Sequence, residues 1–403
     1  MTHPLLSSSH VPLWSEDFAA DPHRAYAQMR SLYGPLVPVE LTPGVPATLV
    51  IGYAQAVRIL NDPDRFPADP RQWQDSVPDT CPVKPMLEWR PNAIRSQGQE
   101  HARYRGANVS ALQTVNQHWL RTLVERVCDR AIEQFLADGR ADLLNQYAQQ
   151  VTFQALSDLL GCPDDIGQRI AEGMLELFDG VNAVRGNITL GRAVADLVTL
   201  KRQRPGYDIT SRLLEHPARL SDTEMSHQVV TLYGAGIEPV VNLITNALLK
   251  LLTDPVVSGD VHAGGASVRE ALDIVLYRDP PLANYCFSYP PYPVEIDGYL
   301  LPAREPVVIS MAGCNNDPAL GGAGSASGDR AHLAWSTGPH ACPARPIAYL
   351  IAETTITHIL DALPTMTLAC PAHQLTWRPG PFHRALTRLP VTFPAVIRDS
   401  GPR

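Results

Sequence analysis

The chain has 403 residues, of which 45 % are hydrophobic and 18 % are charged, and its formal net charge is −8. This composition is typical of a globular protein with a sizeable core. The negative charge and the lack of a Lys/Arg block argue against a nucleic-acid partner and against an anionic membrane surface. They leave room for a local basic patch that docks an acidic protein.

The N-terminal residues MTHPLLSSSHVPLWSEDF lack the basic and apolar regions of a secretion signal. No uninterrupted apolar run reaches the roughly 18 residues of a membrane span. We therefore expect a cytoplasmic protein without a membrane segment. The seven cysteines are scattered and form no CxxC pair, which argues against a disulfide framework and a structural zinc site.

The first half of the chain is predicted to be mainly helical. A helix is expected over 22–34, closed by Gly34, and the segments LVPVEL and ATLVIG then alternate as a β-hairpin. A helix over 53–61 and a long irregular loop over 62–100 follow. Helix dominates from about 100 to 251, and the longest candidate covers 222–253 after a possible N-cap at Ser221.

The second half mixes short strands with helices. We expect a helix over 267–278, short strands within 282–310, a Gly/Ala/Ser loop over 316–330 and a hairpin over 375–397. A helix is expected to begin near Pro343 and to end at about 362. Strands from both ends of the chain are expected to share one minor sheet. The predicted fold class is mainly α with a minor β-sheet region, in a single domain over residues 1–403.

The segment AWSTGPHACPARPIAYLIAE, residues 334–353, combines a stiff turn with a cysteine. Gly338 and Pro339 restrict the backbone ahead of His340 and Cys342. A helix that begins near Pro343 places Cys342 at the positive end of the helix dipole, which favours a thiolate. Such a thiolate can be a nucleophile, a redox thiol or a metal ligand, and a buried structural cysteine fits the local residues equally well.

Several segments together resemble one known family. The pattern Trp335-x-x-Gly338-x-His340-x-Cys342-x-Ala344 resembles the haem-binding loop of the cytochrome P450 family, with Trp335 in the place of Phe and Ala344 in the place of Gly. The segments GQEHARYRG, LYGAGIEP, YRDPPLANY and IDGYLLPAREPVVISMAGCNNDP resemble further family segments in the same order. The resemblance spans essentially the whole chain and implies the cytochrome P450 fold around haem b.

The resemblance also implies roles for single residues. Cys342 would be the thiolate ligand of the iron, and a thiolate favours O–O cleavage. The other expected haem contacts are His101, Arg105, Trp335 and His340. Ala235, Gly236 and Glu238 match the centre of the distal helix and are the expected catalytic residues. The substrate-contacting segments of the family imply contacts from Trp73, Met86, Trp89, Ile237, Val240, Leu282, Ala283, Asn284, Tyr285, Phe382 and His383.

The sequence departs from the family at three places. Ile274 and Tyr277 stand where the family has a Glu-x-x-Arg pair, as in an actinobacterial subgroup that lacks it, and Asp273 and Arg278 flank these positions as partial substitutes. A buried ion pair can be replaced by packed residues at little net cost. Pro239 replaces a threonine of the distal helix, where a kink is expected. Ser288 replaces an arginine on the strand after Pro281.

The resemblance implies an oxidoreductase of bacterial secondary metabolism that uses O2. Because no flavin or iron–sulfur motif is present, electrons are expected from a ferredoxin and its reductase, with peroxide as an alternative. The expected substrate is a small aromatic compound, first of all a cyclic dipeptide with Trp or Tyr, which is coupled or hydroxylated. We expect a monomer. Two alternatives stay open: a haem-binding scaffold or sensor without turnover, and a haem-free helical binding module.

Overall fold

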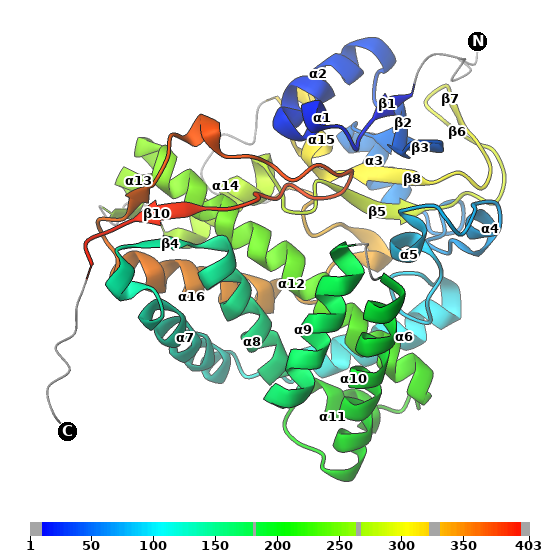
Figure 1. Cartoon of the computed structure of the whole chain (residues 1–403). Helices are drawn as coiled ribbons and strands as arrows, with labels where there is room; N and C mark the ends of the chain where they lie inside the picture. Colours follow the sequence, from blue (N-terminus) through cyan, green and yellow to red (C-terminus); the bar gives the residue numbers. More distant parts are fainter. Residues whose placement is uncertain (1–9, 180–182, 263–266, 322–330, 396–403) are drawn as a thin grey trace, which may run out of the picture.

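The computed structural model describes residues 10–179, 183–262, 267–321 and 331–395. Figure 1 shows the larger sheet together with α1, α2 and α3 at one corner of the molecule, while helices make up most of the remainder, β4 and β10 lie on the opposite side, and α12 crosses the middle. The observed fold is mainly α with small sheets, as predicted.

The described residues contain three small sheets. The strands are β1 (Val11–Pro12), β2 (Leu36–Thr42), β3 (Val45–Val50), β4 (Arg140–Asp142), β5 (Asn284–Ser288), β6 (Val294–Ile296), β7 (Tyr299–Leu301), β8 (Val307–Ser310), β9 (Thr367–Leu368) and β10 (Pro390–Thr392). The larger sheet has the order β1-β2-β3-β8-β5, and β6 pairs with β7. The strands before residue 51 thus share a sheet with strands between residues 284 and 310, whereas the C-terminal strands β9 and β10 join β4 in a separate sheet, so the prediction of one sheet from both ends is confirmed only in part.

The helices cover most of the rest. They are α1 (Glu16–Ala20), α2 (Pro22–Tyr33), α3 (Tyr53–Leu60), α4 (Arg71–Gln74), α5 (Lys84–Leu87), α6 (Gly98–Gln113), α7 (Gln117–Glu133), α8 (Gln149–Leu159), α9 (Asp164–Asp179), α10 (Ala183–Gln203), α11 (Ile209–Glu215), α12 (Asp222–Thr253), α13 (Pro255–His262), α14 (Val268–Arg278), α15 (Met311–Asn315) and α16 (Arg345–Ala362). Ser221 caps α12, since its hydroxyl accepts the Glu224 N–H and the Glu224 carboxylate accepts the Ser221 N–H.

Some predicted elements differ from the structure. The segment 375–397 is not a regular hairpin: one isolated bridge joins Trp377 to Leu386, and β10 pairs with β4 and β9 instead. Pro379 and Pro381 remove the amide donors that a hairpin ladder would need. The loop over 62–100 contains the short helices α4 and α5, and α16 begins two residues after Pro343. Most of the loop expected over 316–330 lies outside the described residues.

The helix α12 is the central core element. It runs through Pro239 as one helix of 32 residues and packs against α8, α10, α14 and α16. By length and composition alone it could cross a membrane, but 56 % of its most apolar window is buried inside the protein. Its apolar character is therefore explained by the core.

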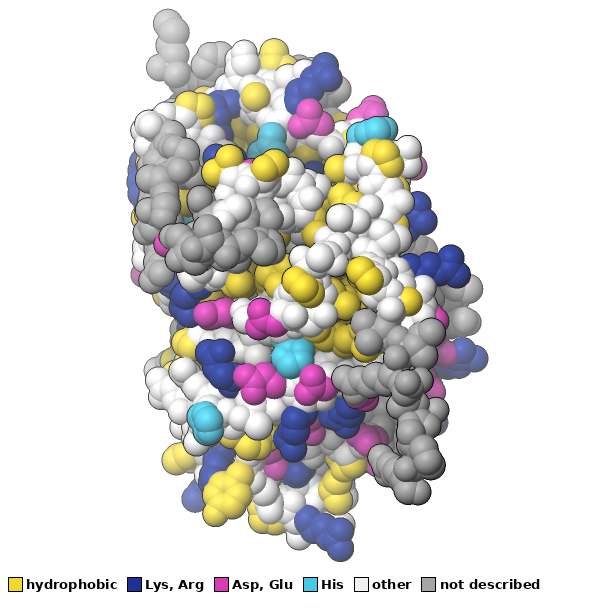
Figure 2. All heavy atoms as spheres, turned by 90° about the vertical axis from the view of Figure 1, so that its left-hand side faces the viewer, with side chains coloured by type: hydrophobic (Ala, Val, Ile, Leu, Met, Phe, Trp, Pro, Cys, Tyr) yellow, Lys and Arg dark blue, Asp and Glu magenta, His cyan; other side chains and the backbone are white. Residues whose placement is uncertain are grey.

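On the face shown in Figure 2, Lys and Arg side chains are interspersed with Asp and Glu side chains.

Candidate active site

The loop that carries Cys342 is held against α3. Residues Gly338–His340 form a short 3-10 turn, and the Cys342 N–H donates to the Trp335 carbonyl at 2.8 Å. Gly338 has a φ of +71°, and a Cβ at this position would lie 2.2 Å from the Leu60 carbonyl oxygen. Only glycine fits here, because both the backbone conformation and the close contact exclude a side chain. The loop therefore has one fixed position relative to the end of α3.

A mainly apolar cavity of about 260 Å³ lies beside this loop. Cys342 and Trp335 line it from the loop, and α12 contributes a wall around Ala235 and Gly236. A second cysteine, Cys286 of β5, also lines it. Further lining residues that sequence reasoning missed are Phe66, Ile94, Arg95, Asn108, Leu156, Thr231, Leu232 and Phe287. A mainly apolar space with few polar groups is typical of a cofactor or ligand site.

Two arginines at this cavity lack an anionic partner. The guanidinium of Arg95 is buried and donates to the Met86 carbonyl and the Tyr285 hydroxyl, each at 3.0 Å. Arg105 donates to the Ala341 carbonyl. Within the described part of the chain neither guanidinium forms an ion pair with a carboxylate. Because a charge withdrawn from water is costly without a counter-ion, the buried Arg95 and the half-buried Arg105 indicate that an anion belongs here.

Two histidines lie close to these arginines. The rings of His101 and His340 lie 4.1 Å apart between centroids. The His101 Nε2 atom is buried and has no hydrogen-bond partner among the described residues. Burial, with the nearby His101 and Arg105, lowers the pKa of His340 to about 4. Burial and Arg105 also lower the pKa of His101. Both imidazoles are therefore neutral near pH 7 and can donate a hydrogen bond to a bound anion.

These features fit haem. A flat apolar ring suits the cavity, and its carboxylates would satisfy the two arginines and the His101 nitrogen. The thiol of Cys342 supplies a soft donor of the kind that iron accepts.

One electrostatic expectation is corrected by the fold. The position of Cys342 before α16 was expected to favour the thiolate, but burial is the largest effect and raises the pKa of the thiol. The backbone N–H groups of Ala344 and Arg345 oppose this shift, as does the Arg105 charge. Deprotonation of Cys342 therefore has to accompany metal binding.

The three expected catalytic residues separate in space. Ala235 and Gly236 line the cavity, whereas Glu238 is not among its lining residues. The Glu238 carboxylate forms an ion pair with Arg378 and accepts the Asn242 amide at 3.2 Å. Burial opposes its ionisation, but Arg378 and His383 outweigh that effect and lower the pKa of Glu238. It is thus an ionised, paired carboxylate rather than a free acid at the cavity.

Of the residues expected to contact substrate, some line the cavity and the others lie elsewhere. Leu282 and Tyr285 line the cavity, and the others do not. Trp73, Ala283 and Phe382 belong to the apolar core beside the larger sheet, and Asn284 bonds Tyr26 and the Pro381 carbonyl. Ile237 and Val240 pack into the main helical core, and His383 is buried near Glu238. Met86 is 36 % exposed, and the Trp89 ring lies under the Arg71 guanidinium. Neither lines the cavity.

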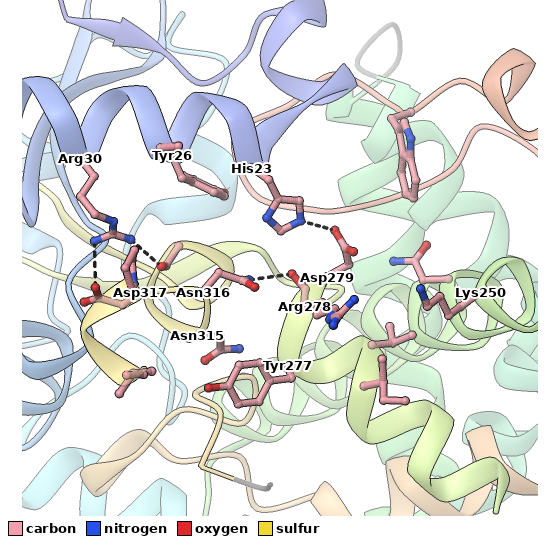
Figure 3. Close-up of a pocket in the computed structure, with 18 of the residues that line it drawn as sticks. His23, Tyr26, Arg30, Lys250, Tyr277, Arg278, Asp279, Asn315, Asn316 and Asp317 are labelled. Atoms are coloured by element: carbon pink, nitrogen blue, oxygen red, sulfur yellow. Dashed lines mark hydrogen bonds and ion pairs between the residues drawn. The ribbon is translucent and has the colours of Figure 1, made fainter. Parts of the chain in front are cut away.

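A larger hollow of about 1110 Å³ lies elsewhere, between α2, α14 and the ends of α12 and α15. Figure 3 shows that its polar side chains pair across it: His23 with Asp279 at 2.9 Å and Arg30 with Asp317 at 3.6 Å. These pairs join α2 to α14 and to the segment after α15. Tyr277 also lines this hollow, so the family's Glu-x-x-Arg position is occupied here by an uncharged ring.

The arrangement of helices, small sheets and a half-buried cysteine loop beside an apolar cavity is that of a cytochrome P450. No protein-family model matches the chain. It is 29 % identical over 401 residues to the cytochrome P450 monooxygenase PikC of Streptomyces venezuelae. The match covers 96 % of this chain and 94 % of PikC. It is 26 % identical to the 6-deoxyerythronolide B hydroxylase of Saccharopolyspora erythraea, over 94 % and 98 % of the two chains.

Solved structures agree in fold. CYP154C4 from Streptomyces sp. ATCC 11861 superposes with a TM-score of 0.88 at 24 % identity, over 96 % of this chain and 99 % of that chain. The monooxygenase TamI gives a TM-score of 0.83 at 23 % identity, over 95 % of this chain and 100 % of that chain. The chain therefore has the cytochrome P450 fold, and its curated bacterial relatives support an enzyme whose cofactor is haem held by a cysteine thiolate.

Proposed function

We propose that Cys342 is the thiolate ligand of the haem iron, with Arg95, Arg105, His101 and His340 around the propionates. The observation that carries the proposal is a cysteine beside one apolar cavity, together with two guanidinium groups that form no ion pair with a carboxylate among the described residues. Arg95 would then take over the role of the strand arginine that Ser288 replaces. The chain would belong to a subgroup that lacks the Glu-x-x-Arg pair. Bound haem supplies oxygen activation, and the protein binds, orients and shields.

We infer that the substrate is a small aromatic natural product, oxidised by hydroxylation or by oxidative coupling. The rings of Phe66, Tyr285 and Phe287 line the cavity and favour a flat, partly aromatic molecule. A relative from Streptomyces carzinostaticus, 28 % identical, is named 2-hydroxy-5-methyl-1-naphthoate 7-hydroxylase, which is consistent with aromatic chemistry. A Trp- or Tyr-containing cyclic dipeptide is the first compound class to test.

A carbonyl on α12 supports a substrate with N–H or O–H groups. Pro239 has no amide hydrogen to donate to the Ala235 carbonyl four residues earlier. Ala235 lines the cavity, so this carbonyl is an acceptor beside the substrate space. Thr231 is the hydroxyl-bearing residue among the described cavity-lining residues of α12. A substrate that donates its own hydrogen bond is therefore favoured over an apolar hydrocarbon.

We also propose an electron donor, a cellular compartment and an oligomeric state for this enzyme. Electrons would come from a ferredoxin and its reductase, which dock near Arg345 at the start of α16, with peroxide as the alternative oxidant. The protein would act as a cytoplasmic monomer. Hydroxylation places one oxygen atom of O2 in the product and one in water. Coupling would form a bond between two positions that each lose one hydrogen atom, and O2, with two electrons from the ferredoxin and two protons, would be reduced to two molecules of water.

The haem ligand is tested by replacing each cavity cysteine. The carbon monoxide complex of the reduced protein should show the long-wavelength Soret band of a thiolate ligand. Cys342→Ala should lose this band, and Cys286→Ala should keep it. Retention of the band in Cys342→Ala would reject the ligand assignment, and a colourless protein after expression with a haem precursor would reject haem binding.

The substrate class is tested by optical titration. Cyclic dipeptides, macrolides and terpenoids are added to the ferric protein, and the spin-state change of the Soret band is measured. Cyclic dipeptides that contain Trp or Tyr should shift the spectrum, and those with only aliphatic residues should not. A haem protein without turnover is the second candidate, because Glu238 is paired and Pro239 replaces the threonine. Product formation with a ferredoxin system would exclude it.

A further inference from the structure

The helix α14 carries a buried acid one residue before the apolar Ile274. Asp273 is only 4 % exposed. Its Oδ1 atom accepts a hydrogen bond from the hydroxyl of Tyr349, which is 1 % exposed and belongs to α16. Since α16 begins three residues after Cys342, this contact joins α14 to the helix that follows the cysteine loop.

The ring of Tyr349 continues the connection into the loop itself. The rings of Tyr349 and Trp335 are in contact, with centroids 5.4 Å apart and planes at 41°. The Trp335 carbonyl in turn accepts the Cys342 N–H at 2.8 Å. A continuous series of contacts therefore runs from Asp273 through Tyr349 and Trp335 to the backbone of Cys342.

Two guanidinium groups hold the Tyr349 ring from both helices. Arg269 of α14 lies 4.4 Å from the ring centroid, and Arg345 of α16 lies 5.6 Å from it. Arg269 also pairs with Glu353 of α16 at 3.4 Å. The ring is thus restrained by its hydroxyl, by its contact with Trp335 and by two cations. A restrained ring is a firm support for the loop that packs on it.

We propose that Asp273 and Tyr349 are a positioning pair that holds the Trp335–Cys342 loop in the geometry for thiolate ligation, in the place of the absent Glu-x-x-Arg pair. The proposal rests on the assignment of Cys342 as the haem ligand and is independent of the substrate. Burial and the hydrogen bond to Asp273 raise the pKa of Tyr349 to about 12. Tyr349 therefore remains a neutral hydrogen-bond donor across the working pH range.

The test removes each half of the pair from the full-length haem protein. Tyr349→Phe deletes the donor, and Asp273→Leu deletes the acceptor. Each variant should lower the ratio of the thiolate-ligated to the neutral-ligand carbonmonoxy form by about tenfold, as expected for a hydrogen bond to an acidic group. The reduction potential should shift as well. The double variant should be no worse than Asp273→Leu alone, because Tyr349→Phe then removes a hydrogen bond that is already lost.

The matched control is Tyr147→Phe. The Tyr147 hydroxyl is buried and donates to the Thr355 carbonyl of the same α16 at 2.7 Å, far along the helix from the cysteine loop. This variant should lower the melting temperature and keep the wild-type spectrum and potential. If Tyr349→Phe and Asp273→Leu both keep the wild-type ratio, or if Tyr147→Phe alters it equally, the inference is rejected. A wild-type protein without the thiolate band would instead reject the ligand assignment. If one variant fails to fold, the other decides.

Discussion

Arg378, in the segment that leads to β10, forms an ion pair with Glu238 in the middle of α12. The two residues are 140 positions apart in the chain. The Arg378 side chain is 50 % exposed and the Glu238 side chain 25 %. The pair therefore links the C-terminal segment to the core helix, and it holds the acid expected to be catalytic away from the cavity.

Glu238→Gln should lower the free energy of unfolding by about 1 kcal/mol and leave the haem content unchanged. A partly buried, charge-assisted hydrogen bond has this magnitude, reduced here by the exposure of Arg378. Chemical denaturation and a haem assay measure the two effects. Glu215→Gln is the control, since Glu215 pairs with Arg212 at the surface and its loss should change stability by less than about 0.5 kcal/mol. Loss of haem in Glu238→Gln would contradict this interpretation.

The stability of the protein should fall between pH 6.5 and pH 4 because of His383. Burial lowers the pKa of His383 to about 4, although Glu238 opposes and Arg378 reinforces that shift. In the unfolded chain the pKa is about 6.5, so the unfolded state takes up a proton first as the pH falls. The contribution of the neutral His383 to the free energy of unfolding is therefore fully present above about pH 6.5 and is lost progressively as the pH falls toward 4.

From about pH 7.5 to pH 5 the loss from this one group is about 2 kcal/mol. His383→Asn should remove that part of the pH dependence and leave the rest. Urea unfolding of both proteins at the two pH values measures the difference. Equal slopes for wild type and variant would show that His383 does not carry the effect.

Arg95→Met should stabilise the haem-free protein and weaken haem binding. In the haem-free state the substitution removes a buried charge that has no carboxylate partner among the described residues. In the haem-bound state it removes a charge-assisted hydrogen bond, which corresponds to roughly a tenfold or greater loss of haem affinity. Haem transfer to an acceptor protein and thermal unfolding report the two effects.

Arg103→Met is the control for that experiment. Arg103 lies on α6, pairs with Glu224 at 2.5 Å and does not line the cavity. Its loss should destabilise the protein without changing the rate of haem transfer. Equal haem release from both variants would argue against a direct contact between Arg95 and the cofactor.

Gly338→Ala should prevent the cysteine loop from reaching its position. The new Cβ would meet the Leu60 carbonyl carbon at 3.0 Å and its oxygen at 2.2 Å, and φ is positive. Several kcal/mol of destabilisation and loss of bound haem are expected. Gly44→Ala has a similar φ of +77° with nothing within 4 Å, so it should cost only about 1 kcal/mol. Comparable effects in the two variants would mean that backbone conformation alone is responsible.

Most helices were predictable because their signals are local. Ser221 and Glu224 form a capping box within four residues, and Gly34 ends α2 with a positive φ. The cysteine loop was also predictable, since Gly338, His340 and Cys342 stand together in the sequence. The hairpin over 375–397 was only partly right: Trp377 pairs with Leu386, but β10 pairs with β4, because an alternating pattern does not say which strand becomes the partner.

The sequence also could not show which of the expected substrate contacts line the cavity and which are buried in the core. Trp73, Phe382 and Val240 are apolar residues in segments near the cavity, yet all three are buried in the core. An aromatic or branched side chain satisfies a core position as well as a pocket wall, so residue type does not separate the two. Arg95 belongs to none of the recognised motifs. From the sequence, an arginine in a Pro- and Trp-rich loop is expected at the surface, and only the tertiary structure shows that it is buried.

The residues alone thus determined the family-like elements: a helix-rich chain, a stiff turn before Cys342, and the unusual Ile274, Tyr277 and Pro239. The tertiary structure decided which charges meet. Glu238 reaches Arg378, and Asp273 reaches Tyr349 across 76 positions. Such pairs depend on how helices pack in space, and sequence periodicity describes one helix at a time.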